Sequence, residues 1–168
     1  MDNDAGIKTI CFYARIHDIL TWPTAKAEEA PTLEERVALV GEFIMKTGTK
    51  FGQFEITLEK GALDSKGAGS AGNSSAENLL KLFRYGLERN ILGWIETYKN
   101  DDLVFIIEDL QGNHRVVGAP GLPAQIMPDW EVLGGDAVSS EKYVQINVRS
   151  VGRIAKFYDG TIPLTEAL

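Results

Sequence analysis

Residues 103–118 read LVFIIEDLQGNHRVVG and indicate a β-hairpin. The first half, Leu103 to Leu110, is rich in β-branched and aromatic side chains, which favour a strand. Gln111-Gly112-Asn113 supplies residues that tolerate a tight turn, and His114 to Gly118 continues as a second apolar run. The stretch therefore predicts two antiparallel strands joined by a short turn.

Apolar and polar residues alternate with period two in several other segments, which predicts further strands. Two of these segments, 37–45 and 54–58, flank the Gly-containing turn 46–50 and predict a second hairpin. Single strands are predicted at 7–16, 143–149 and 154–158. Antiparallel pairing therefore dominates the predicted fold.

The segment between these strands, residues 59–76, reads EKGALDSKGAGSAGNSSA. It is rich in Gly, Ser and Ala and lacks a hydrophobic period, which predicts a long loop. Structureless loops longer than about 15 residues are uncommon inside domains and are usually functional or disordered. We therefore expect this segment to have a role of its own.

One helix is predicted at residues 87–98, because apolar side chains recur there at helical spacing. The preceding residues 79–87 fit either a helix or a strand, and the pattern alone does not choose between them. The whole chain, 1–168, is therefore predicted to be one mainly β (α+β) domain: an antiparallel β-sandwich or barrel of two hairpin sheets with one flanking helix and the long loop.

Composition excludes several classes of protein. The chain has 168 residues, 17 basic and 24 acidic, for a net charge of −7. This balance argues against a protein that grips nucleic acid through its phosphates. Cys11 is the single cysteine and cannot form an internal disulfide. The first residues are acidic, where a signal peptide would be basic. The longest apolar run, Leu103–Ile107, is too short for a membrane span. A soluble, cytoplasmic protein is predicted.

Candidate catalytic motifs have little support. Gly67 to Gly72 matches the dinucleotide pattern G-x-G-x-x-G, but polar residues precede it and no β-α-β pattern surrounds it. His17, His114 and Cys11 show no metal-ligand spacing. Adjacent carboxylates such as Glu108-Asp109 point to opposite faces of a strand. The sequence predicts no enzyme, cofactor or metal site, and a nucleotide-dependent enzyme remains the weakest hypothesis.

The order of these pieces resembles phage tail tube (major tail) proteins, which share a fold with the inner-tube and ring proteins of contractile injection systems. The resemblance lies in a run of short segments: VALVGEFIMKTGTKFGQFEITLE (37–59), the Gly/Ser loop (60–76), NILGWIETYKND (90–101), VFIIEDLQGNHRVVGAP (104–120), GGDAVSSEKYVQINVRS (134–150) and AKFYDGTIP (155–163). None of them is a catalytic signature.

The resemblance implies a structural virion protein of the tail, assembled in the host cytoplasm as stacked, hexameric rings that form a channel for DNA. Its partners would be further copies of itself and other tail proteins (tape measure, terminator, baseplate or sheath), with no membrane contact and no specific DNA binding. Residues 59–76 would reach a neighbouring subunit, and 1–6 and 162–168 would form terminal arms. An acidic lumen would repel DNA phosphates over a Debye length of about 8–10 Å.

Two sets of residues follow from this interpretation. The lumen-facing residues are expected to be Glu42, Gln53, Glu55, Thr57, Gln145, Asn147 and Arg149, with Arg149 as the basic exception. The inter-subunit loop residues are expected to be Lys60, Asp64, Lys66, Ser70 and Asn73. An ordinary solvated strand face explains the same polar pattern. A ligand-binding β-barrel, a tail terminator, a baseplate hub ring and a secretion-system inner tube also remain open, as does the choice between contractile and non-contractile tails.

Overall fold

A five-stranded antiparallel sheet forms the central layer of the protein. The computed structural model describes residues 7–25, 32–56, 62–85, 87–109, 111–134, 142–165 and 167. The order of its strands is β14 (Lys156–Tyr158), β10 (His114–Val117), β9 (Leu103–Asp109), β1 (Ile7–Arg15) and β6 (Gly52–Glu55). We call this layer the central sheet. β9 and β10 pair antiparallel, from Glu108 opposite His114 to Phe105 opposite Val117. The hairpin predicted at 103–118 is therefore confirmed.

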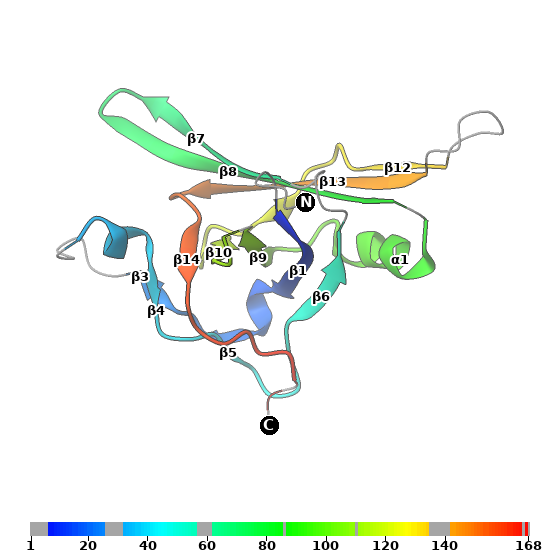
Figure 1. The fold of residues 1–168 in the computed structure, drawn as a ribbon, viewed down its shortest axis with the longest axis horizontal. Helices are drawn as coiled ribbons and strands as arrows, with labels where there is room; N and C mark the ends of the chain where they lie inside the picture. Colours follow the sequence, from blue (N-terminus) through cyan, green and yellow to red (C-terminus); the bar gives the residue numbers. More distant parts are fainter. Residues whose placement is uncertain are drawn as a thin grey trace.

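A second antiparallel sheet, the outer sheet, crosses one side of the central sheet (Figure 1). Its strands are β11 (Gln125–Ile126), β13 (Tyr143–Gly152), β8 (Asn73–Tyr85) and β7 (Ala62–Ser70), in that order, and β12 (Glu131–Leu133) also pairs with β13. β8 and β13 pair from Tyr85 opposite Tyr143 to Ala76 opposite Gly152. The β7–β8 hairpin projects beyond the rest of the molecule (Figure 1).

The Gly/Ser-rich segment is therefore a hairpin, and the predicted long loop at 59–76 is wrong over its described residues. β7 and β8 pair across the turn Ala71-Gly72, while residues 57–61 lie outside the described ranges. Strand propensity depends strongly on context, and β8 gains its partner from β13. Gly69 has a φ of +105°, and a Cβ there would lie 2.5 Å from the Asn73 carbonyl oxygen, so the hairpin requires glycine at this position.

The second predicted hairpin, 37–45 with 54–58, does not form. Its first half divides into η2 (Glu34–Val37), β4 (Leu39–Val40) and β5 (Ile44–Met45). β4 pairs with β3 (Thr24–Ala25), β5 pairs with β2 (Ile19–Thr21), and β6 pairs with β1. Of the apolar residues that alternate here, Phe43, Met45 and Ile56 are buried, the others in the described ranges are half-buried, and Leu58 lies outside those ranges. The buried ones pack into two hydrophobic cores instead of pairing with each other. The mainly β, antiparallel fold class with one helix is confirmed.

Two hydrophobic cores cover the two faces of the central sheet, which explains the unbroken apolar run in β9. Leu103, Phe105 and Ile107 face the core shared with the outer sheet and α1 (Arg89–Tyr98). Val104 and Ile106 face the opposite core, which contains Phe43, Phe51 and Tyr158. A strand that is buried on both faces loses the alternation of a half-exposed strand.

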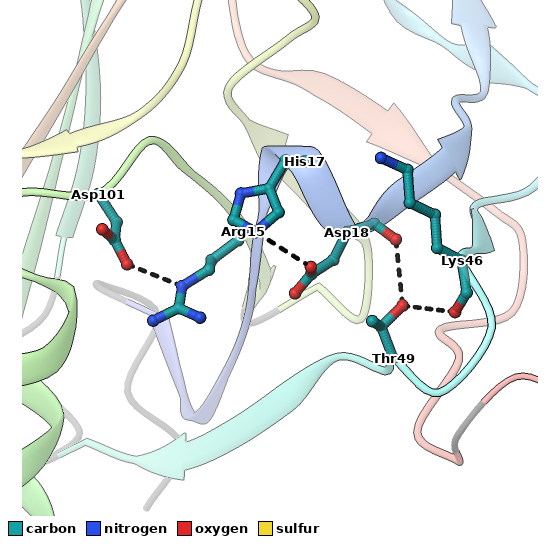
Figure 2. Close-up of polar contacts among 6 residues, drawn as sticks. All are labelled: Arg15, His17, Asp18, Lys46, Thr49 and Asp101. Atoms are coloured by element: carbon teal, nitrogen blue, oxygen red, sulfur yellow. Dashed lines mark hydrogen bonds and ion pairs between the residues drawn. The ribbon is translucent and has the colours of Figure 1, made fainter.

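The predicted helix is confirmed, since α1 buries Ile91, Trp94 and Ile95 in the first core. The undecided residues 79–85 are strand, as part of β8. Arg15 Nε donates to Asp101 Oδ2 at 2.8 Å (Figure 2). The Arg15 guanidinium also lies 4.8 Å from the centre of the Tyr98 ring. The contact with Asp101 connects the end of β1, before η1 (Ile16–Asp18), to the turn that follows α1.

The described end of the chain lies along residues 47–51. The Phe51 amide donates to the Pro163 carbonyl at 2.9 Å, and the Ala167 amide donates to the Thr49 carbonyl at 3.1 Å. Residues 1–6, 166 and 168 lie outside the described ranges. A role of the two ends as inter-subunit arms stays a prediction.

Candidate assembly surface

The outer sheet has one covered face and one bare face. Leu80 and Leu82 of β8 and Ile146 of β13 point into the first core, so the alternate residues point away from it. Gln145, Asn147 and Arg149 therefore lie together on the bare face. These three residues of the predicted lumen-facing set share one surface.

The other predicted lumen-facing residues lie elsewhere. Gln53 and Glu55 are exposed on β6, which is the edge strand of the central sheet. Glu42 is exposed between β4 and β5, and Thr57 lies outside the described residues. Since the hairpin that would have carried this group does not form, the predicted set divides between different sheets. The described members therefore do not share one face within a single subunit, and their place relative to a channel stays a prediction.

The charges of the bare face are mixed. Its charged strand residues in the described ranges are Asp64, Lys66, Glu77, Lys81, Glu131 and Arg149. Arg149 Nε donates to Glu77 Oε1 at 2.9 Å, so the predicted basic exception is neutralised by its neighbour on β8. Fifteen of the 17 basic and 16 of the 24 acidic residues lie in the described ranges, which are thus nearly balanced in charge. Over its described residues, this face does not carry the strongly acidic surface that was expected of the lumen.

An aromatic cluster that sequence analysis missed lies at one end of the bare face. The Phe83 ring stacks on Tyr143 with a centroid distance of 4.8 Å and meets the Tyr85 ring edge-on at 5.0 Å. Phe83 is only 8% exposed although it points away from the core, whereas Tyr85 is 48% exposed. The two-residue alternation of this segment signalled the cluster, but the competing helical period concealed it.

The outer sheet ends in β7, whose outer edge has no partner strand among the described residues. Ser70 and Asn73 flank the two-residue turn and form a hydrogen-bonded pair. From there, hydrogen-bonded and non-hydrogen-bonded pairs alternate along the antiparallel ladder, and residues in non-hydrogen-bonded pairs direct their N–H groups away from β8. Leu63, Ser65 and Gly67 therefore direct their backbone N–H groups toward this open edge. The predicted inter-subunit residues Asp64, Lys66, Ser70 and Asn73 are exposed on the same hairpin, and Lys60 lies outside the described ranges.

The residues considered for catalysis are not brought together. His17 is 73% exposed at its side chain and lies 3.3 Å (Nε2 to Oδ1) from Asp18, while Cys11 is fully buried (Figure 2 shows the His17 contact). Gly72 is followed by strand β8, where a dinucleotide site would need a helix. Among the described residues, no three His, Cys, Asp or Glu side chains gather in metal-binding geometry.

Burial raises the pKa of the Cys11 thiol, so we expect stability to fall at alkaline pH. The folded protein keeps the thiol proton, while the unfolded chain releases it above about pH 8.5, and folding is then opposed. Between pH 8 and 9.5 the wild type should lose about 1 kcal/mol more free energy of unfolding than Cys11→Ala. Urea unfolding of both proteins measures this difference, and equal losses would contradict it.

A pocket of about 370 Å³ lies between the two sheets at the side of β3 and β14. Its walls are mostly apolar, with Trp22, Leu39 and Val116 among them, and Asn78 and Ser150 are buried polar residues at its boundary. The volume is sufficient for a small ligand, since ligand pockets start at about 300 Å³.

Comparison of the chain with models of protein families, with curated proteins and with solved structures found no significant match. No helix in the described ranges is long and apolar enough to cross a lipid bilayer.

Proposed function

We propose that this protein is a structural subunit of a phage tail tube, which assembles as stacked rings around a channel for DNA. The observation that carries the proposal is the outer sheet: it covers the core with one face, leaves the other face bare, and ends in the open edge of β7. The residues that resemble tail tube proteins supply the biological setting.

Open sheet edges favour head-to-tail association. An exposed edge strand presents unpaired N–H and C=O groups that pair readily with another strand. In our proposal, β7 of one subunit pairs with the β11 and β12 side of the next subunit, which is the opposite side of the same sheet. Such a heterologous contact closes into a ring when its rotation fits, and stacked rings form a tube. Sheets joined in this way would form a continuous barrel.

The bare face would line the channel. A DNA-binding surface needs free cations, because neutralised phosphates release counterions and so drive binding. Here Arg149 is already paired with Glu77, and three acidic residues accompany the three basic ones. A channel of this composition would hold phosphates only weakly. Gln145 and Asn147 would add a polar, uncharged lining.

Negative-stain electron microscopy of the purified protein at rising concentration tests the proposal. Rings or tubes with a central channel are expected, together with a concentration-dependent sedimentation coefficient. A strict monomer at every protein and salt concentration would contradict a tail tube subunit. Single rings that never stack would instead favour a terminator or hub ring, which share the predicted fold.

The pocket between the sheets supports a second candidate function, a ligand-binding β module. This alternative requires a monomer in which a small apolar ligand raises the melting temperature. The microscopy samples separate the two functions, since a monomeric, ligand-stabilised protein would replace the first proposal by the second.

A further inference from the structure

A groove of about 470 Å³ lies beneath the β7–β8 hairpin, on the covered side of the outer sheet. Small residues of the hairpin form its roof, and residues of η2 and of the β13–β14 connection form the opposite wall. The basic residues on the groove are Arg36, Lys66, Arg153 and Lys156, and no Asp or Glu in the described ranges lines it. In a chain with a surplus of acidic residues, such a cluster requires an explanation.

Three of these cations lack a counter-ion within the described part of the chain. Lys66 lies opposite Glu77 in the β7–β8 register, so its side chain belongs to the bare face. In contrast, Arg36, Arg153 and Lys156 form no ion pair with any carboxylate of the described residues. Lys156 Nζ donates to the Arg36 backbone carbonyl, at 3.0 Å.

The groove is electrostatically unfavourable when it is empty of negative charge. Burial, and then the charge of Arg153, lower the pKa of Lys156. Like charges that share a partly buried site repel, and an anionic group placed between them removes the repulsion. The groove is therefore suited to carboxylates.

Apolar surface continues from the charged part. Arg153, Ile154 and Lys156 also line the pocket between the sheets, so the two depressions meet at these residues. At this junction Ile154 is 51% exposed, and Leu122 on the pocket wall is 47% exposed. A segment that carries carboxylates beside apolar side chains would fill both parts.

We propose that this groove receives an acidic segment of a second copy of the chain during assembly, and that it thereby connects neighbouring subunits. Charge complementarity supports this occupant: the described body is nearly neutral, while eight of the 24 acidic residues and only two of the 17 basic ones lie outside the described ranges. The same chain thus supplies both the cationic groove and an excess of acidic groups. The inference rests on the proposed tube function.

Charge reversal tests the groove. In sedimentation velocity at low salt, Arg153→Glu should raise the protein concentration needed for half-assembly about tenfold or more, because like charges across an interface repel. Added salt should weaken wild-type assembly and narrow the difference between the two proteins. Lys50→Glu, an equal charge change at an exposed residue away from the groove, is the matched control and should assemble as the wild type does.

The outcomes separate the two proposals. If the wild type assembles and Arg153→Glu assembles equally well, the groove interaction is overturned and the tube function is left intact. A wild type that never assembles would overturn both. Circular dichroism verifies that each variant is folded, and Arg36→Glu replaces Arg153→Glu if the latter unfolds. A loss of assembly in Lys50→Glu as large as in Arg153→Glu would show a general charge effect and would also overturn the groove interaction.

Discussion

Gly67→Pro is expected to abolish ring formation while the monomer stays folded. Gly67 lies opposite Ala76 in a non-bonded pair of the β7–β8 hairpin, so its N–H points to the open edge. Proline has no N–H, and it is tolerated on edge strands for this reason. A Cβ at Gly67 meets no atom within 4 Å, so the added ring has room. Electron microscopy and sedimentation should show a monomer where the wild type forms rings.

Gly67→Ala is the matched control, because it adds a Cβ at the same position but keeps the N–H group. It should assemble as the wild type does, and both variants should retain the wild-type circular dichroism spectrum. If Gly67→Pro assembled normally, pairing through the β7 edge would be wrong, and the ring would have to form through another surface. If Gly67→Ala also lost assembly, the side-chain surface rather than the N–H group would be responsible.

Local signals predicted the elements whose partners are close in sequence. The hairpin at 103–118 has β-branched strands on both sides of a turn that contains Gly112 and Asn113, so its partner is specified locally. The helix at 89–98 follows from its apolar stripe. In contrast, alternation at 37–58 correctly predicted that Phe43, Met45 and Ile56 are buried, but not which strand each segment pairs with. Residues 62–70 form a strand by pairing with β8, whose other side is paired with β13, a partner distant in sequence.

For the candidate surface too, the sequence predicts what depends on a single strand and not what depends on contacts between strands. Alternation in β13 correctly grouped Gln145, Asn147 and Arg149, since the faces of a single strand need no knowledge of its partners. The Glu77 partner of Arg149 depends on the β8–β13 register, so a sequence cannot reveal that neutralisation. Arg36 and Lys156 are far apart in the chain, and only the fold brings them to one groove. Local patterns therefore predict faces, whereas the pairing of charges requires the tertiary structure.

The β7–β8 hairpin and the groove below it both depend on one buried polar residue, Asn78, which is 2% exposed. Its Nδ2 donates to the Arg153 carbonyl at 2.8 Å, and its Oδ1 accepts from the Ser65 hydroxyl at 2.6 Å and from the Ala155 amide at 3.2 Å. One side chain thus connects β7 and β8 to the β13–β14 connection. Buried polar groups that lose their partners cost free energy that a surface group does not.

Asn78→Ala should lower the free energy of unfolding by about 2–4 kcal/mol, because each buried partner left unpaired costs about 1–3 kcal/mol. The Ala155 amide and the Arg153 carbonyl are the groups left without their partner, while the exposed Ser65 hydroxyl can turn to water. Asn147→Ala on the bare face is the matched control and should change stability by at most about 0.5 kcal/mol. Urea unfolding of both variants provides the comparison. Equal effects would mean that Asn78 does not anchor the hairpin to the body, and the wall of the groove would then be held by its backbone pairing alone.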